Sequence, residues 1–490
     1  MSEHLKAERA QEWREILRKS MKNKDRTAIP RVKMPEVDPE VRSHTYDEVN
    51  LGLTEAMAVN ESHRCLDCVD PTCITGCPVE INIPKFIKNI ERGEILEAAR
   101  TLKETSALPA VCGRVCPQER QCESQCFYTL KMKKEPVAIG HLERFAADYE
   151  RMSGELSVPA TAPSNGIRIA VVGSGPAGLA FAGDMVKFGY DVTVFEALHE
   201  LGGVLRYGIP EFRLPNDIVD TEIDGLRKMG VKFETNCIIG KTISQEDLKA
   251  EGYRAIFVGS GAGLPNFMNI PGENLNGIMS CNEYLTRVNL MQAADPESDT
   301  PVHMGKKVAV IGGGNTAMDA VRTARRLGAE RAMIIYRRSE EEMPARIEEI
   351  KHAKEEGIEF YTLHNPLRYE GDEQGRVRRM ELQRMELGAP DQSGRRRPVP
   401  IEGDTVWMEV DEVIVSVGVS PNPLIPQSFN GLEVTKWGTI VVNQETMQTA
   451  DEMIYAGGDI VRGGATVILA MGDGRRAAKA MHQHLQQINS

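Results

Sequence analysis

After residue 165 the chain alternates between short runs rich in Val and Ile and longer stretches in which apolar residues recur at helical spacing. The clearest runs are residues 167–172, 191–195, 307–311 and 332–336. Strands that alternate with amphipathic helices are typical of parallel sheets covered by helices. We therefore predict an α/β fold for this part of the chain.

The N-terminal part has a different pattern, in which polar residues surround a few apolar runs of helical spacing. Residues 1–40 are predicted to form an arm, and residues 41–157 a helical domain. Within this domain the apolar spacing predicts helices near residues 83–104 and 138–152. Residues 158–165 are rich in Pro, Ser, Thr and Asn, which indicates a linker to the α/β part.

The first strand leads into Gly173-x-Gly175-x-x-Gly178 and then a helix, which is the context required of a dinucleotide-binding loop. We expect Gly173 to make the turn, Gly175 to let the backbone approach a pyrophosphate, and Gly178 to allow close packing of the helix. Glu196 ends the next strand, where an acid accepts hydrogen bonds from a ribose diol. The candidate loop residues are Gly173, Ser174, Gly175, Pro176, Ala177 and Gly178.

A second loop of the same kind follows the strand at residues 307–311, with alanine in its last position. Its candidate binding residues are Gly312, Gly313, Gly314, Asn315 and Thr316. The next strand ends in Arg337 and Arg338, where an NAD site would have an acid, and two guanidinium groups suit a 2'-phosphate. We therefore predict NADP(H) here, with Arg346 as a third candidate contact. Alternatively, the two arginines are ordinary solvated charges at a strand end.

Charge narrows the choice of partners and compartment. The chain has 490 residues, 59 Lys plus Arg against 71 Asp plus Glu, and a net charge of -12. This charge repels phosphate backbones, so nucleic acid is not an expected partner. No apolar run approaches the ~18 residues of a membrane helix, and the N-terminus has no apolar signal-peptide core, so no membrane association is expected. The chain is therefore expected to be cytoplasmic. Thiols are kept reduced in the cytoplasm, so a dense set of cysteines there indicates metal binding rather than disulfides.

Eight of the ten cysteines fall in two runs, C-x2-C-x4-C-x3-C-P and C-x3-C-P-x4-C-x3-C. The runs are Cys65, Cys68, Cys73 and Cys77, followed by Cys112, Cys116, Cys122 and Cys126. Thiolates are soft donors that suit iron, and ferredoxin-type runs ending in Cys-Pro send their last cysteine to the other cluster. We therefore predict two [4Fe-4S] clusters, with structural zinc as the main alternative. Cys237 and Cys281 stand apart and are expected to be isolated thiols.

Residues 201–215 and 455–460 resemble the flavoprotein oxidoreductase family with two dinucleotide-binding domains. The resemblance implies FAD at the first loop, with Asp459 at the flavin ribitol. It implies further contacts at Gly203, Leu205, Arg206, Gly458 and Thr466. The segment after residue 465 is predicted to be a helix whose N-terminus favours negative charge on a reduced flavin. A plain core position against the sheet suits that helix equally.

The order of these parts, with the motifs VGSGPAGL, GGGNTAMD, YRR, MPA and AGGD, resembles the small (beta) subunit of NADPH-dependent glutamate synthase. It is also similar to the large subunit of electron-bifurcating ferredoxin-NADP oxidoreductase and to the N-terminal half of dihydropyrimidine dehydrogenase. The resemblance covers nearly the whole chain after about residue 40. It implies an NADP domain at residues 296–405 inserted in an FAD domain at residues 166–295 and 406–490.

The resemblance also implies that the two cysteine runs interleave. One cluster would be held by Cys65, Cys68, Cys73 and Cys126. The other would be held by Cys77, Cys116 and Cys122. Its last ligand stays open between Cys112, which is available by count, and Glu143, because a Glu or Gln serves there in relatives. The alternative for Glu143 is an exposed helix carboxylate.

The function implied is transfer of a hydride from NADPH to FAD, and then of single electrons through the clusters to a partner subunit. No catalytic acid or base is expected, because hydride transfer needs stacking and close contact. The expected partner, in a hetero-oligomer, is the glutamate synthase large subunit, which makes glutamate from glutamine and 2-oxoglutarate, or another electron-accepting flavoprotein subunit. The alternatives are the large subunit of an electron-bifurcating NADH-dependent ferredoxin-NADP oxidoreductase and a non-catalytic electron carrier. A disulfide reductase is disfavoured, because residues 201–215 contain no cysteine.

Overall fold

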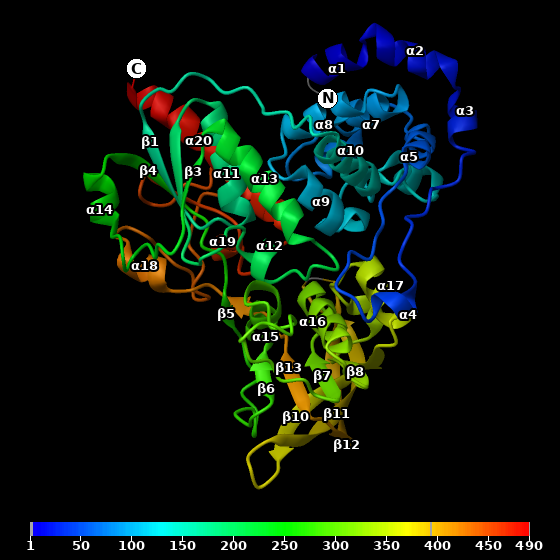
Figure 1. The fold of residues 1–490 in the computed structure, drawn as a ribbon, viewed down its shortest axis with the longest axis vertical. Coiled ribbons are helices and arrows are strands. Elements are labelled where there is room, and N and C mark those ends of the chain that lie inside the picture. The colour runs from blue at the N-terminus through cyan, green and yellow to red at the C-terminus, as the bar shows by residue number, and fades with distance from the viewer. Residues whose placement is uncertain (1–2, 393, 490) are drawn as a thin grey trace.

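The computed structural model describes residues 3–392 and 394–489, which form three bodies (Figure 1). A helical N-terminal body lies beside one α/β domain, and a second α/β domain extends away from both. The predicted α/β fold with a helical N-terminal domain is confirmed. Within the described ranges, no helix combines the length and the apolar character that a bilayer crossing requires.

The predicted arm is helical and packs on the helical domain. Its helices are α1 (Glu3–Arg9), α2 (Glu12–Ser20), α3 (Asn23–Arg26) and α4 (Pro39–Arg42). Arg14 and Arg18 both form ion pairs with the carboxylate of Asp67, and Arg9 Nε donates to the Asp67 carbonyl at 2.8 Å. Asp67 is fully buried and lies between the first two cysteines, so the arm is anchored on the cysteine loop.

The helical domain has six α-helices and two shorter turns. They are α5 (Glu55–Ser62), α6 (Thr72–Thr75), α7 (Ile83–Glu91), α8 (Ile95–Lys103), α9 (Pro109–Val115) and α10 (Ile139–Ser153), a 3-10 turn (Gln118–Arg120) and a π-helical turn (Tyr128–Met132). The single helix predicted over residues 83–104 is divided at Gly93, whose φ of 84° favours glycine. Fully buried side chains such as Phe86 and Ile90 form the core of this domain.

The first α/β domain is built on a parallel sheet with the strand order β15-β4-β1-β2-β3. Its strands are β1 (Arg168–Val172), β2 (Asp191–Phe195), β3 (Lys232–Glu234), β4 (Tyr253–Val258) and β15 (Ile454–Ala456). Its helices are α11 (Pro176–Lys187), α12 (Val204–Tyr207), α13 (Asn216–Met229), α14 (Gln245–Ala250), α18 (Leu424–Ser428), α19 (Asp459–Arg462) and α20 (Val467–Asn489). The inner residues of the central strand β1 are buried, as expected when helices cover both faces.

The second α/β domain has a parallel sheet with the order β6-β13-β7-β8-β9. Its strands are β6 (Ile278–Ser280), β7 (Lys307–Ile311), β8 (Arg331–Tyr336), β9 (Glu359–Thr362) and β13 (Glu412–Val415). Its helices are α15 (Cys281–Leu285), the π-helical turn Thr286–Leu290, α16 (Asn315–Arg326), the 3-10 turn Glu340–Glu342 and α17 (Ile347–Glu355). An antiparallel sheet of β10 (His364–Gly371), β11 (Val377–Pro390) and β12 (Arg396–Glu409) shares an apolar core with it.

The second domain is inserted between β4 and β15, but the expected boundaries at residues 296 and 405 are wrong. β6 lies before the first boundary and β13 after the second, and both strands pair within the second sheet. The chain crosses between the domains at a ribbon of β5 (Leu264–Pro265) and β14 (Val419–Ser420). With three residues, β6 is too short to show a strand pattern in the sequence.

Candidate functional site

The first glycine loop has the geometry that a dinucleotide pyrophosphate requires. A Cβ on Gly173 would lie 2.6 Å from the Gly259 carbonyl oxygen, and one on Gly178 would lie 2.0 Å from the Gly173 carbonyl oxygen. A Cβ on Gly175 would meet no atom of the described residues within 4 Å. Gly173 and Gly178 therefore permit close backbone packing, whereas Gly175 leaves open space in front of α11 for phosphate oxygens.

Glu196 is fixed at the end of β2, directly beside this loop. Its carboxylate accepts hydrogen bonds from the Ser174 amide at 2.9 Å, the Ser174 hydroxyl at 2.6 Å and the Leu198 amide at 2.9 Å. The Ser174 hydroxyl also accepts from the Gly202 amide at 3.0 Å. Because a carboxylate has about four acceptor positions, Glu196 keeps capacity for a ribose hydroxyl.

The two flavin-type segments converge on the same loop. A Cβ on Gly203 would lie 3.0 Å from Gly175 Cα, and one on Gly458 would lie 3.0 Å from Ala177 Cβ. Asp459 begins α19 next to Gly458, and burial raises the pKa of its carboxyl to about 6. The pyrophosphate, ribose and ribitol candidates therefore meet in one place, as one FAD molecule requires.

Three other flavin candidates are used within the protein. Leu205 is fully buried, and Arg206 is ion-paired with Asp220 of α13. Thr466 directly precedes α20, and its hydroxyl accepts from the Leu469 amide at 3.4 Å. Leu205 is therefore a core residue, and Thr466 caps the N-terminus of the predicted helix.

The second glycine loop repeats this arrangement. A Cβ on Gly312 would lie 2.3 Å from the Ser416 carbonyl oxygen, whereas one on Gly314 would meet only Pro344, at 3.9 Å. A Cβ on Gly313 would lie 2.8 Å from the ring of Tyr336. α16 begins at Asn315, and Thr316 is exposed beside it. A second space for phosphate oxygens is therefore present at the N-terminus of α16.

Sequence reasoning did not identify the backbone residues that these loops pack against. Gly259 follows β4 and Ser416 follows β13, each on a strand next to the one that carries the loop. The glycine-rich segment at residues 259–263 was a signal for the first contact. No comparable signal marks Ser416, because residues 416–420 are not glycine-rich.

The three candidate arginines of the second loop are not equivalent. Arg337 is exposed, and its side chain has no ion pair or hydrogen bond within the described part of the chain. Arg338 is buried and forms an ion pair with Asp391 at 3.1 Å. Arg346 is also buried, and its Nη1 donates to the Arg114 carbonyl at 2.7 Å. The expectation that Arg346 joins a 2'-phosphate clamp is therefore wrong for this structure, because its guanidinium is used at the helical domain.

The first cysteine group contains one residue from the second run. Its members line one pocket and are Cys65, Cys68, Cys73 and Cys126. Burial, followed by the charges of Cys65 and Cys126, raises the pKa of Cys68 to about 12 and raises that of Cys73 well above its usual value. The structure thus brings together the four residues that the resemblance placed on one cluster.

The second cysteine group surrounds Glu143, which is buried and not an exposed helix carboxylate. Besides burial and, at Cys116, a hydrogen bond with Cys112, the charge of Glu143 contributes to the raised pKa of four thiols. These are the thiols of Cys77, Cys112, Cys116 and Cys122. Burial raises the pKa of Glu143 to about 8, and its Oε1 has no hydrogen-bond partner in the described residues. Cys112 Sγ lies 3.4 Å from Met471 Sδ of α20. Both candidates for the last ligand are therefore at this group.

The chemistry of both groups fits a bound metal cluster. Burial keeps these thiols protonated unless a nearby cation compensates the thiolate charge. The ten cysteines are all free. The two runs are nevertheless closely packed, because a Cβ on Gly76 of the first run would lie 2.8 Å from Gln125 Cγ of the second. Two groups of buried donors without disulfides suit iron, and a buried carboxylate without a partner suits an oxygen ligand.

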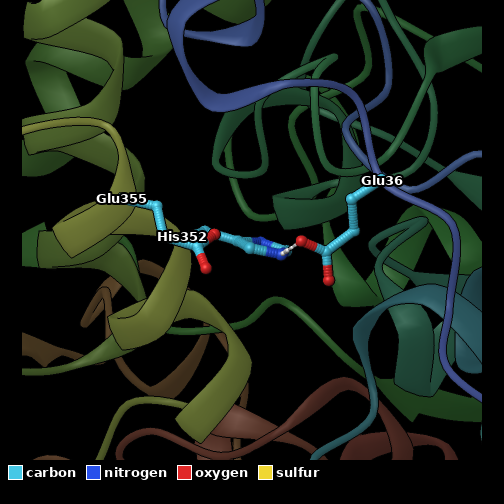
Figure 2. A group of neighbouring side chains, drawn as sticks. All are labelled: Glu36, His352 and Glu355. Carbon is cyan, nitrogen blue, oxygen red and sulfur yellow. Dashed lines mark ion pairs between the residues drawn. The ribbon is translucent and has the colours of Figure 1, made fainter.

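A third group of possible metal ligands connects the arm with α17. Figure 2 shows Glu36 and His352 directed at each other, with Glu36 Oε2 and His352 Nε2 3.3 Å apart, and Glu355 nearby. Arg42 pairs with Glu36 at 3.2 Å and with Glu355 at 2.5 Å, and Lys351 Nζ lies 3.0 Å from Glu36. These cations already neutralise the carboxylates, so the group is an ion-pair junction and does not fit a metal.

Two family matches divide the chain at the linker. Residues 42–155 match the family described as dihydropyrimidine dehydrogenase domain II, 4Fe-4S cluster, and residues 167–480 match the pyridine nucleotide-disulphide oxidoreductases.

Relatives cover nearly the whole chain. The glutamate synthase [NADPH] small chain of Escherichia coli is 35% identical over 94% of this chain and 98% of its own length. The NADPH-Fe(3+) oxidoreductase subunit beta of Geobacter sulfurreducens is 37% identical over 87% of this chain and 65% of its own. Mycobacterium tuberculosis FprA in complex with NADPH has the same fold, with a TM-score of 0.56 and 20% identity over 66% of this chain and 86% of that one.

Proposed function

Because the chain belongs to the family of the glutamate synthase [NADPH] small chains, within the pyridine nucleotide-disulphide oxidoreductases, we propose that it supplies electrons from NADPH to a partner subunit that makes glutamate from glutamine and 2-oxoglutarate. The chain is an NADPH-dependent FAD oxidoreductase with [4Fe-4S] clusters. When bound, FAD would serve as the acceptor of a hydride from NADPH, and the clusters would serve as one-electron carriers.

The contact between α20 and the cysteines carries the proposal. A Cβ on Gly472 would lie 2.9 Å from the carbonyl oxygen of Pro78, directly after Cys77. On the same turn, Met471 touches Cys112. The N-terminal end of α20 lies behind the Gly458 segment, since the Gly458 amide donates to Asp473 of α20 at 3.1 Å. One helix therefore touches both the proposed flavin site and the second cysteine group.

The two cysteine groups follow one another toward the protein surface. Burial raises the pKa of Cys122 in the second group, and the charge of Cys73 in the first group adds to this increase. The second group is almost wholly buried, whereas Cys68 and Cys73 are half-buried, and Cys68 is followed by the exposed Val69. This order supports electron transfer from the second group to the first and then to a partner at the surface.

The proposed function is tested by purification with the partner. We expect the chain to copurify with a glutamate synthase large subunit, and the pair to form glutamate from glutamine and 2-oxoglutarate when NADPH is added anaerobically. A reconstituted pair that reduces its flavin with NADPH but forms no glutamate would contradict the proposal.

The relative that reduces Fe(3+) supports one other candidate, in which the same chain serves a different acceptor. In that case NADPH would drive reduction of a ferric or ferredoxin-type acceptor by the purified chain, and the copurifying subunit would not bind glutamine. Rapid flavin bleaching by NADPH would in either case exclude a non-catalytic carrier.

Arg337→Ala should weaken NADPH binding by about 10-fold to 100-fold, because one charge-assisted hydrogen bond is worth ~1.5–3 kcal/mol. NADH, which has no 2'-phosphate, should bind the variant and the natural protein equally. Arg254, an exposed arginine of β4, provides a matched control as Arg254→Ala. The measurement is the KM for each nucleotide in flavin-dependent ferricyanide reduction. Equal loss for NADH and NADPH would contradict a 2'-phosphate contact.

A further inference from the structure

A turn of the helical domain holds the segment that follows the second nucleotide strand. Arg120 lies in the 3-10 turn between Cys116 and Cys122, and its two terminal nitrogens donate to three consecutive carbonyls of residues 343–345, at 2.9, 3.0 and 3.0 Å. These residues are the MPA motif. An exposed arginine of the cysteine-rich domain therefore binds the backbone of the second α/β domain.

Neighbouring residues strengthen this attachment. Arg346 Nη2 donates to Gln118 Oε1 at 2.9 Å, and the Ile347 amide donates to Glu119 Oε1 at 3.2 Å. All the partners from the helical domain come from the turn Gln118–Arg120, except the Arg114 carbonyl described above. Because this turn joins two candidate ligands of the second cluster, the contact connects the cluster loop with the second α/β domain.

The attached segment in turn holds the second glycine loop. The Ala345 amide donates to the Gly313 carbonyl at 3.2 Å, and the Arg346 amide donates to Asn315 Oδ1 at 2.8 Å. Pro344 is also the residue that a Cβ on Gly314 would meet, at 3.9 Å. Residues 343–346 therefore form a wall behind the open space at the N-terminus of α16.

We propose that Arg120 is a positioning residue for NADP(H), which acts by holding residues 343–345 against the loop that receives the cofactor's pyrophosphate. The inference rests on the NADP(H) site under the proposed function. The planar guanidinium presents several donors in a fixed arrangement and so can satisfy adjacent carbonyls together, whereas a lysine ammonium lacks this fork. Affinity for NADP(H) then depends on a residue that does not touch the cofactor.

The test uses the full-length protein, prepared anaerobically with its FAD and clusters. Arg120→Ala, Arg120→Lys and the control Arg100→Ala are titrated with NADP+ and with adenosine 2'-monophosphate, which lacks the pyrophosphate. Arg100 is a half-exposed arginine of the same domain, paired with Glu97. We expect Arg120→Ala to weaken NADP+ binding roughly 10-fold, equivalent to ~1.4 kcal/mol. Arg120→Lys should recover part of the loss, and Arg100→Ala should match the natural protein.

Binding of adenosine 2'-monophosphate should stay unchanged in Arg120→Ala, and KM for NADPH should rise while kcat is kept. Thermodynamic reciprocity further predicts that NADP+ slows amide exchange in residues 116–122 of the natural protein more than in Arg120→Ala. Unchanged NADP+ binding in Arg120→Ala, or equal loss for both nucleotides, would overturn the inference. Failure of the natural protein to bind either nucleotide would instead overturn the proposed NADP(H) site, and the inference with it.

Discussion

Cys126→Ala should remove the cluster of the first cysteine group, although Cys126 lies in the second run of the sequence. Its thiol shares a cavity with Cys65, Cys68 and Cys73, and each [4Fe-4S] cluster needs its full set of ligands. Iron and acid-labile sulfide should fall from about eight to about four per chain. FAD content and flavin reduction by NADPH should be kept, because both nucleotide loops lie in the α/β domains.

Cys237→Ala is the matched control for this change. Cys237 lies alone in the first α/β domain, where its thiol contacts the Thr242 hydroxyl at 3.9 Å. Iron and sulfide should be the same as in the natural protein. If Cys126→Ala removed the electron paramagnetic resonance signal of the buried second group and kept that of the first, the interleaved ligand sets would be wrong.

Glu143→Ala should remove the second cluster, whereas Cys112→Ala should keep it. Both side chains lie at the second group, but Oε1 of Glu143 is buried without a partner, which is costly unless the oxygen coordinates a metal. Cys112 Sγ contacts Met471, so its loss leaves a small cavity beside α20 rather than an open coordination position. The expected iron content is about four per chain for Glu143→Ala and about eight for Cys112→Ala.

Glu143→Gln separates ligation from charge. An amide oxygen can still coordinate iron, so the variant should keep its iron and shift only the reduction potential of the second cluster. Loss of iron in Cys112→Ala with full iron in Glu143→Ala would assign the position to Cys112 instead.

Local patterns were sufficient for the elements and for most of the candidate site. Alternation of apolar runs predicted β1, β2, β7 and β8, and the glycine spacings predicted the two loops, because each feature needs only a few adjacent residues. The cysteine groups came from spacing together with the family resemblance. Their crossing was implied by the resemblance and is repeated in the structure.

The remaining features depend on contacts between distant parts of the chain. Arg346 was a third candidate contact for a 2'-phosphate, but its guanidinium donates to Gln118, more than two hundred residues away. Asp67 lies in a cysteine loop and binds three arginines of the arm, although no motif in the sequence marks it. No local pattern contains this information, since a charged side chain in sequence does not reveal its partner.

The most direct test of iron clusters held next to a flavin is metal and sulfide analysis of anaerobically prepared protein, followed by electron paramagnetic resonance after reduction. We expect about eight iron and eight labile sulfide per FAD, two reduced-cluster signals, and magnetic interaction between them. Zinc at the thiolates, with neither iron nor labile sulfide, would contradict it.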